Sequence, residues 1–275
     1  MKNYKVVVSD LDGTLLDNDK KISKENSEAI CEMRDMGIDF VASSGRCLSE
    51  MPSEVMNNPH IKYVSCSDGA VIYDKNTGEA IVKNYMPKDV VKQCSDILRD
   101  YEILPMTHIN GCLYIDRDRF NHEIYEYNNV TAPFESLMGE IGVRARDCLS
   151  EAENSDEVEL FCVFFHSEAE LEKCIERLLA LGEVKIASSE KYNIEVYHKS
   201  AGKGRALYPL AEFLGCDISE IIAVGDSKND FEMVKEAGLG LAMSNSMPEL
   251  LKIADEVICS NLEHSAKYIL ENYIK

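Results

Sequence analysis

The residues of this sequence best suited to chemistry are two aspartates near its beginning. Asp10 ends the run Val6–Ser9, which is largely apolar, and Asp12 stands two residues later, before Gly13. The run is typical of a buried strand, and the glycine is typical of the turn that leaves it. Two carboxylates in such a position are costly without charge compensation. One can attack phosphorus while the other holds a proton, so the pair predicts phosphoryl transfer, with an Asp-rich structural turn as the alternative.

A second acidic motif lies in the last third of the chain. Asp226, Asn229 and Asp230 follow Gly225, which directly succeeds the apolar run Ile221–Val224. Two carboxylates beside a glycine at a strand end suit a hard cation with oxygen ligands, which for phosphate chemistry is usually Mg²⁺. The alternative is a turn that caps the next helix.

Two short segments have residue types that bind phosphate. Ser44, Gly45 and Arg46 follow a predicted strand, where a small hydroxyl beside a flexible backbone suits phosphate oxygens. Lys203 stands between two glycines at a predicted helix start. A cation there is unfavourable for the helix dipole, so we expect another reason for it, such as a bound phosphate. An ordinary capping turn and a solvated lysine are the alternatives.

The elements that must position these residues alternate between strand and helix at both ends of the chain. This alternation predicts an α/β fold, with a parallel sheet and helices on both faces. The predicted strands end near 10, 43 and 66 and cover 194–197, 221–224, 239–242 and 256–259, with a hairpin at 71–82. The predicted helices cover 23–36, 48–57, 203–214 and 230–237, with others from 248 and 263.

The middle of the chain has a different pattern. A predicted helix over 88–99 precedes strands near 103–107 and 112–116, an irregular stretch with Pro133 and Gly139, a strand over 157–165, a helix over 168–181 and a strand over 183–187. This α+β pattern predicts an insertion at 84–190 between the two halves, 1–83 and 191–275, of an α/β domain.

Charge and composition exclude several classes of partner. The formal net charge of −20 argues against nucleic acid and anionic membrane surfaces, which require a basic footprint. No apolar stretch approaches the length of a membrane-spanning helix, and Met1–Lys5 leads into the first strand without a secretion signal. The ten cysteines stand singly, which predicts buried thiols in a reducing cytoplasm. The oligomeric state is left open.

Together, the four motifs resemble those of haloacid dehalogenase superfamily phosphatases, in the Cof-type (type IIB), sugar-phosphatase-like branch. The resemblance rests on Asp-Leu-Asp-Gly-Thr at 10–14, Ser-Gly-Arg at 44–46, Lys-Gly at 203–204 and Gly-Asp-x-x-Asn-Asp at 225–230. It implies a Rossmann-like parallel-sheet core formed by 1–83 and 191–275. It also implies that 84–190 is an α+β cap domain that reads the leaving group.

The resemblance implies a role for each motif residue. Asp10 would be the nucleophile, and Asp12 would protonate the leaving group and later deprotonate water, which requires a buried, anionic neighbourhood that raises its pKa. Mg²⁺ would be held by the Asp10 carboxylate, the Asp12 carbonyl and Asp226. Asp230 would orient Lys203 or the metal site. The phosphoryl oxygens would be bound by residues of three motifs: Ser44, Gly45, Arg46, Lys203 and Asn229.

Three departures from the family pattern affect the outer site and the tail. Asp68 stands where the family often has asparagine before Gly-Ala, and it adds negative charge near the cap entrance. Ser244-Asn245-Ser246 replaces the usual Gly-Asn-Ala, and His264-Ser265 replaces an acidic residue and glycine.

The sequence therefore predicts a Mg²⁺-dependent phosphatase that hydrolyses a small phosphomonoester, such as a sugar phosphate or related metabolite, through an aspartyl-phosphate. A phosphomutase of sugar phosphates and a phospho-ligand-binding protein without turnover are the alternatives. The pair of Asp10 and Asp12 disfavours the binding protein, because a binding module needs no acid/base. The physiological substrate is not readable from the sequence.

Overall fold

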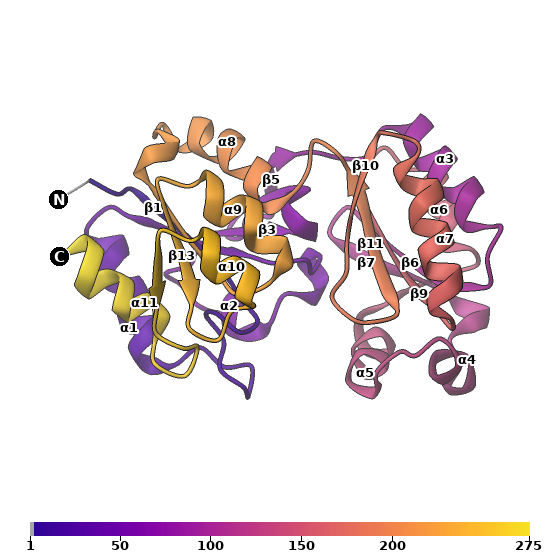
Figure 1. Ribbon diagram of the computed structural model, residues 1–275, viewed down its shortest axis with the longest axis horizontal. Helices are drawn as coiled ribbons and strands as arrows, with labels where there is room; N and C mark the ends of the chain where they lie inside the picture. The colour runs from indigo at the N-terminus through magenta and orange to yellow at the C-terminus, as the bar shows by residue number, and fades with distance from the viewer. Residues whose placement is uncertain (1–2) are drawn as a thin grey trace. The chain divides into compact units, whose positions relative to one another are not determined.

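The computed structural model describes residues 3–275, which fall into two compact units. The core unit consists of the described residues up to 45 together with 51–83 and 202–275. The inserted unit consists of 46–50 and 84–201. The course of the chain through each unit can be followed by colour in Figure 1.

The core unit is built on an eight-stranded sheet. Its strands are β1 Val6–Asp10, β2 Asp39–Ser43, β3 Tyr63–Cys66, β4 Val71–Asp74, β5 Glu79–Lys83, β12 Ile221–Gly225, β13 Leu239–Met243 and β14 Glu256–Ile258. Their order across the sheet is β14-β13-β12-β1-β2-β3-β4-β5. The strands from β14 to β3 pair in parallel, and β4 and β5 form the predicted antiparallel hairpin. The α/β fold class is confirmed.

Strand β1 lies at the topological switch point of the sheet, where the strand order changes direction. From β1 the chain continues to β2 and β3 on one side, and it later returns to build β12, β13 and β14 on the other. The loops of the two halves diverge at the carboxyl end of β1, which is where open α/β sheets place their ligand sites. Asp10 is the last residue of β1 and so lies at this point.

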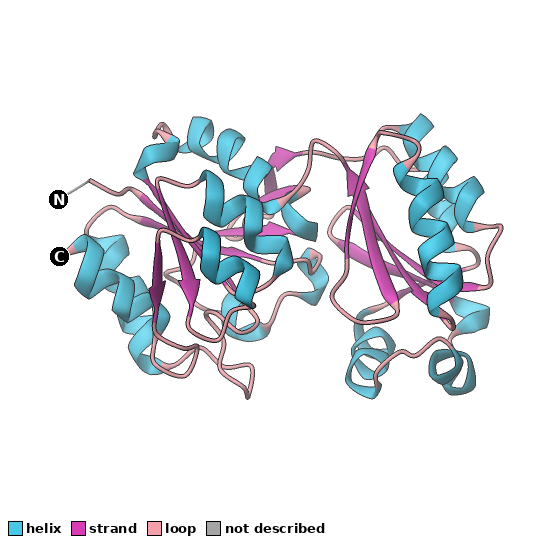
Figure 2. Ribbon diagram, in the orientation of Figure 1, coloured by secondary structure: helices cyan, strands magenta, loops and turns pink. Residues whose placement is uncertain are grey.

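Helices flank this sheet (Figure 2). Helix α1 begins after Ser23, whose side chain accepts a hydrogen bond from the backbone N–H of Asn26. Helix α8 contributes Leu207 to a buried cluster that includes Val6 and Val8 of β1. The core helices are α1 Lys24–Asp35, α2 Ser53–Met56, α8 Lys203–Leu214, α9 Phe231–Glu236, α10 Pro248–Ile253 and α11 Ser265–Ile269.

The inserted unit is built on a six-stranded sheet, which is antiparallel except at one edge. Its strands are β6 Ile103–Ile109, β7 Cys112–Asp116, β8 Val143–Ala145, β9 Val158–Phe165, β10 Val184–Ala187 and β11 Asn193–His198, in the order β10-β11-β9-β6-β7-β8. Its helices are α3 Lys88–Leu98, α4 His122–Tyr127, α5 Ala132–Ile141, α6 Cys148–Glu153 and α7 Glu168–Leu179.

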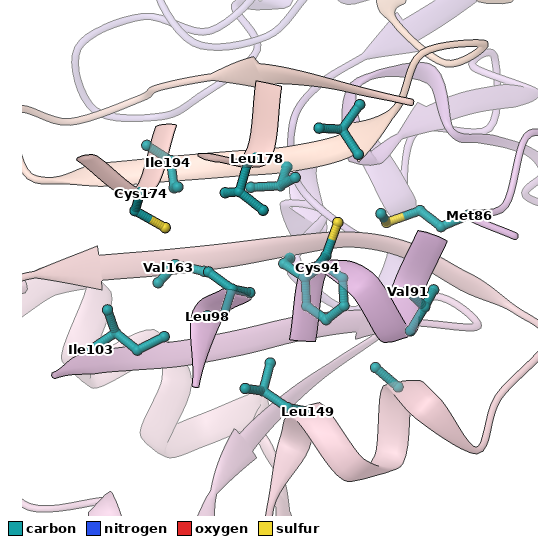
Figure 3. Close-up of a cluster of buried hydrophobic side chains, with 14 of the residues drawn as sticks. Met86, Val91, Cys94, Leu98, Ile103, Leu149, Val163, Cys174, Leu178 and Ile194 are labelled. Atoms are coloured by element: carbon teal, nitrogen blue, oxygen red, sulfur yellow. The ribbon is translucent and has the colours of Figure 1, made fainter. Parts of the chain in front are cut away.

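Helices α3, α6 and α7 cover one face of this sheet and form the core of the inserted unit (Figure 3). Val163 and Ile194 of the sheet pack there with Leu98 of α3. Cys94 and Cys174 are fully buried in the same cluster, where they act as small apolar side chains. Six of the ten cysteines are buried as predicted, whereas Cys31, Cys112, Cys216 and Cys259 are only partly buried. Within residues 3–275, no helix combines the length and the apolar character needed to cross a membrane.

The end of the insertion differs from the predicted one. The alternation of strands and helices predicts that 191–275 belongs to the core, with the strand at 194–197 as its first element. That strand is β11, which pairs antiparallel with β9 and β10 of the inserted unit, so 191–201 belongs to this unit. Strand–helix alternation does not indicate which of two sheets a strand joins, and this explains the error.

Two local predictions also differ from the structure. The helix predicted over 48–57 is interrupted before Pro52: a 3-10 turn covers Leu48–Glu50, and α2 begins only at Ser53. The stretch predicted as irregular holds α4, α5, β8 and α6. Pro133 lies in the first turn of α5, where a missing N–H costs nothing, so it marks a helix start rather than a break.

Candidate active site

Asp10 is hydrogen-bonded to a buried lysine at the end of β1. Its Oδ1 accepts a hydrogen bond of 2.6 Å from the ammonium of Lys203, the first residue of α8. The same ammonium donates to Oδ1 of Asp230 over 2.7 Å. The side chains of Lys203 and Asp230 are shielded from solvent, and that of Asp10 is nearly so. The fold thus joins three of the predicted site residues in one buried ion-pair network.

Nearby carboxylates keep Lys203 charged. Burial lowers the pKa of an ammonium, but the charges of Asp10, Asp230 and Asp68 outweigh this effect and raise the pKa of Lys203 above its ordinary value. An ammonium has three N–H donors, and among the described residues Lys203 uses two of them, on Asp10 and Asp230. One donor therefore remains for an oxygen of a bound anion.

Asp230 is held by the loop that it closes. Its Oδ2 accepts hydrogen bonds from the backbone N–H groups of Asp226 and Ser227, both over 3.0 Å. The loop requires Gly225, because a Cβ on that residue would lie 2.4 Å from the carboxyl carbon of Asp230. Since both of its oxygens are engaged, Asp230 is better suited to orienting Lys203 than to binding a metal ion.

Three carboxylates gather here, and two of them, Asp10 and Asp226, are suited to holding a metal ion. Oxygens of Asp10, Asp226 and Asp230 all lie within 4.8 Å of one another. Burial, followed by the charge of Asp230, raises the pKa of Asp226 to about 6. Burial also raises the pKa of Asp10 well above its ordinary value, although Lys203 opposes the shift. One ammonium leaves an excess of negative charge here, and a divalent cation with oxygen ligands fits this donor set.

Asp12 lies in the turn after β1, and its surroundings differ from those expected. Its side chain is 35% exposed, and its Oδ1 accepts a hydrogen bond of 2.6 Å from the Lys20 ammonium. The condition of a buried, anionic neighbourhood is therefore met only in part: the side chain is partly exposed and faces a lysine, although Asp226 lies near enough for the charge of Asp12 to raise the pKa of Asp226. Lys20 lies near Asp12 because the chain turns here: the backbone N–H of Lys20 donates a hydrogen bond to the carbonyl of Asp17 over 3.0 Å. The spacing of the motif did not predict this turn.

The turn after β1 requires a glycine at position 13. Gly13 has a φ of +80°, and a Cβ there would lie 2.5 Å from Oδ2 of Asp226. The hydroxyl of the next residue, Thr14, donates to Oδ1 of Asp226 over 3.4 Å. The bare backbone of Gly13 thus allows Asp226 to lie against the same turn that carries Asp12.

The C-terminal tail supports this turn. Asn245 donates to the carbonyl of Gly13 over 2.8 Å, and the hydroxyl of Ser265 donates to the carbonyl of Thr14 over 3.0 Å. Ser265 was one of the departures expected to affect the tail contacts. The other departure beside it, His264, has a left-handed φ of 65° and precedes α11. The tail therefore still holds the backbone of the turn in this chain.

The predicted phosphate-binding residues come from both units. Ser44 follows β2 and is buried, and Gly45 ends the first segment of the core unit. Asn229 lies in the loop after β12, and its side-chain amide donates to Oδ1 of Asp68 over 2.9 Å. Arg46 groups with the inserted unit. Ser44, Gly45 and Asn229 therefore share the core unit with the ion pair described above, and Arg46 does not.

Sequence reasoning missed three contacts of the site. The motifs did not assign a contact to Lys20, and the Thr14 hydroxyl was read only as part of a turn. Asp68 was expected at the outer site, yet it is fully buried beside Asn229. One signal was available for Asp68: it follows β3 at the same edge of the sheet as the other motifs.

Residues 7–270 match the family described as haloacid dehalogenase-like hydrolases. The chain is 30% identical to the phosphatase YwpJ of Bacillus subtilis (strain 168), over 98% of this chain and 100% of the relative. It is 26% identical to the 5-amino-6-(5-phospho-D-ribitylamino)uracil phosphatase YwtE of the same bacterium, over 98% of each. A solved haloacid dehalogenase-like hydrolase from B. subtilis gives a TM-score of 0.81 at 25% identity, over 98% of this chain and 99% of the other.

These similarities run through both units and agree with the motifs of the sequence. Because the family match covers almost the whole chain and the relatives above are phosphatases, the chain belongs to the haloacid dehalogenase-like hydrolase family, in its Cof-type branch, and is a phosphoric monoester hydrolase.

Proposed function

We propose that this chain is a Mg²⁺-dependent phosphatase that hydrolyses a small phosphomonoester through an aspartyl-phosphate on Asp10. The observation that carries the proposal is the 2.6 Å bond between Lys203 and Asp10 within the cluster of carboxylates. The bond holds Oδ1 of Asp10 and favours its ionised form. An ionised, immobilised carboxylate at a strand end is an effective nucleophile toward phosphorus.

The reaction has two steps. First, an oxygen of Asp10 attacks the phosphorus, the bond from phosphorus to the leaving oxygen breaks, and that oxygen takes a proton from Asp12. Next, Asp12 takes a proton from water, whose oxygen attacks the phosphorus and releases inorganic phosphate and the Asp10 carboxylate. Asp12 is 35% exposed, so both the leaving group and water have access to it.

The Asp10 carboxylate, the Asp12 carbonyl and the Asp226 carboxylate would hold Mg²⁺. When bound, the ion supplies positive charge that offsets the negative charge of the phosphoryl group. Gly13 serves this arrangement because it leaves room for Asp226 against the turn of Asp12. Thr14 fixes one oxygen of Asp226 through its hydroxyl.

The phosphoryl oxygens would be bound by donors of the core unit. Lys203 has one N–H that is not used within residues 3–275, and it brings positive charge into a chain of net charge −20. The Asn229 amide, the Ser44 hydroxyl and the backbone of Gly45 would supply the remaining donors. Arg46, which directly follows Gly45 in the sequence, stays a predicted phosphate-binding residue. Asp230 would orient Lys203, with which it shares a bond of 2.7 Å.

The inserted unit would serve as the cap that selects the leaving group. Two curated relatives from B. subtilis, YwtE and YcsE, are 5-amino-6-(5-phospho-D-ribitylamino)uracil phosphatases at 26% and 27% identity. We therefore propose a phosphorylated sugar or sugar alcohol derivative as the substrate class. A cytoplasmic location remains the prediction from cysteine usage.

The test is a phosphate-release screen with the purified chain. Sugar phosphates, phosphorylated ribityl compounds, nucleotides and coenzyme phosphates are each incubated with Mg²⁺, and in parallel with a chelator. We expect phosphate release from a subset of the esters, abolished by the chelator. An isomerised sugar phosphate without released phosphate would make the chain a mutase, and tight binding without any product would make it a binding protein.

A further inference from the structure

The turn Ser67–Gly69, which follows β3, has an unusual backbone. Its three consecutive residues have φ values of 49°, 52° and 80°. A left-handed backbone is strained for any residue other than glycine, and such strain persists where the surroundings impose it, often at functional sites. The turn packs directly before Lys203, because a Cβ on Gly69 would lie 2.7 Å from the carbonyl of Gly202.

Asp68, at the centre of this turn, is linked to three loops that carry proposed phosphate-binding residues. Its backbone N–H donates to the carbonyl of Ser44 over 3.1 Å. Its Oδ1 accepts a hydrogen bond of 2.9 Å from the side-chain amide of Asn229. Its charge is one of those that raise the pKa of Lys203. These three residues lie far apart in the sequence, and Asp68 connects them.

The side chain of Asn229 is orientated by two partners. Its amide nitrogen donates to Asp68, and its oxygen accepts a hydrogen bond of 2.7 Å from the hydroxyl of Ser227. The amide therefore cannot rotate without losing both bonds. Its second N–H is fixed in one direction, as a preorganised donor must be.

The buried carboxylate of Asp68 lowers folding stability, and the turn could form without it. The residue is fully buried, and its Oδ2 has no hydrogen-bond partner among the described residues. A buried acceptor without a donor is destabilising, and a glycine would adopt the left-handed backbone without this penalty. The stability of the turn does not explain the carboxylate, whereas its bond to Asn229 does.

We propose that Asp68 is a positioning residue for phosphate binding, which fixes the Asn229 amide and the Ser44 backbone around Lys203 so that all three address one phosphoryl group. This inference rests on the proposed function and adds a residue to it. Asp68 acts through its neighbours and does not touch the reacting atoms. Its loss should therefore weaken phosphate binding more than it slows the chemical step.

The variant Asp68→Gly removes the carboxylate and keeps a φ of 52° accessible, so the turn can still form. With p-nitrophenyl phosphate as the probe, we expect KM and the inhibition constant of inorganic phosphate to rise together by about tenfold, with kcat within about threefold of wild type. Asp68→Asn keeps an oxygen acceptor for Asn229 and should restore most of the affinity.

Asp74→Ala is the matched control. Asp74 lies at the far end of β4, the strand that follows the turn of Asp68, and its carboxylate accepts a hydrogen bond from the Asn76 backbone N–H over 2.9 Å. This variant should leave KM unchanged. If Asp68→Gly has the same KM as wild type, or if Asp68→Asn is as impaired as Asp68→Gly, the positioning role is overturned.

Direct titration with inorganic phosphate in the presence of Mg²⁺, followed by calorimetry, separates this inference from the proposed function. A wild-type chain that releases no phosphate from any ester refutes the function. The comparison of phosphate dissociation constants between wild type and Asp68→Gly still decides the role of Asp68. Equal dissociation constants, or no binding of phosphate to either protein, would refute it.

Discussion

At the scale of single residues, opposing interactions act on the pKa of the Asp10 carboxyl group. Burial raises its pKa, and the ammonium of Lys203 opposes this shift through a bond of 2.6 Å. Lys203 favours the charged form of this carboxylate, against burial and the charges of Asp230 and Asp226. This arrangement has a cost in folding stability and a use in catalysis, and the two can be measured separately.

Asp10→Asn is expected to lower turnover by at least about three orders of magnitude, because an amide is not a nucleophile toward phosphorus. Burial disfavours the charged form, so the neutral variant should not lower the free energy of unfolding of the metal-free protein. Phosphate release and urea denaturation measure the two effects. Asp17→Asn is the control, since Asp17 lies in the following turn and bonds the backbone N–H of Asp19. Near-normal turnover in Asp10→Asn would contradict the assignment.

Lys203→Met is expected to lower the free energy of unfolding by about 3–5 kcal/mol at neutral pH, because it leaves Asp10 and Asp230 buried without their cation. The loss should shrink as the pH falls, because burial raises the pKa of Asp10 and its protonation removes a buried charge that the variant leaves without a cation. Urea denaturation at several pH values measures it. A loss that is the same at every pH would show that the buried charges are not its cause.

At the scale of elements, local signals predicted most helix and strand positions. Ser23 caps α1, and the apolar runs before Asp10 and Asp226 are β1 and β12. The errors have non-local causes. Strand β11 joins the second sheet through antiparallel partners that no local pattern reveals, and Pro133 begins α5 rather than ending an element.

The turn after β1 gives a prediction with a built-in control. Gly13 and Gly37 have nearly the same φ, +80° and +81°, but a Cβ would meet Asp226 only at Gly13, and nothing within 4 Å at Gly37. Alanine at either position should cost about 1–2 kcal/mol of stability through the left-handed backbone. Only Gly13→Ala should also weaken Mg²⁺ activation, measured as the Mg²⁺ concentration for half-maximal phosphate release. The same half-maximal Mg²⁺ concentration in both variants would mean that Mg²⁺ binding does not depend on the packing of Asp226 against this turn.

At the scale of the whole molecule, the sequence predicted which loops meet but not how their side chains pair. Parallel strands bring their carboxyl ends to one edge, so Asp10 and Asp226, at the ends of β1 and β12, were expected together, and their oxygens lie within 4.8 Å of each other. Lys203 follows β11 of the other sheet, so this rule did not predict its bond to Asp10. The contacts of Asp68 with Asn229 and of Lys20 with Asp12 depend on side-chain packing across loops. Spacing along the chain carries no information about such contacts.

The raised pKa of Asp226 predicts that the stabilisation of the protein by Mg²⁺ depends on pH. The pKa of Asp226 is raised to about 6 by burial, so its stabilising contribution is present below the unfolded pKa and is lost as the pH rises through about 6. A bound cation reverses this loss, since it favours the ionised form. The increase in Tm on adding Mg²⁺ should be larger at about pH 7.5 than at about pH 5. An equal increase at both pH values would argue against Mg²⁺ binding at these carboxylates.

The most direct test of the account is chemical trapping of the covalent intermediate. The enzyme is mixed with an excess of a substrate ester and Mg²⁺, quenched during turnover and treated with borohydride, which reduces an aspartyl-phosphate to homoserine. Tandem mass spectrometry then locates the modified residue. The account predicts homoserine at position 10 in the wild-type chain and no modification without substrate. Homoserine at another position, or none during rapid phosphate release, would contradict it.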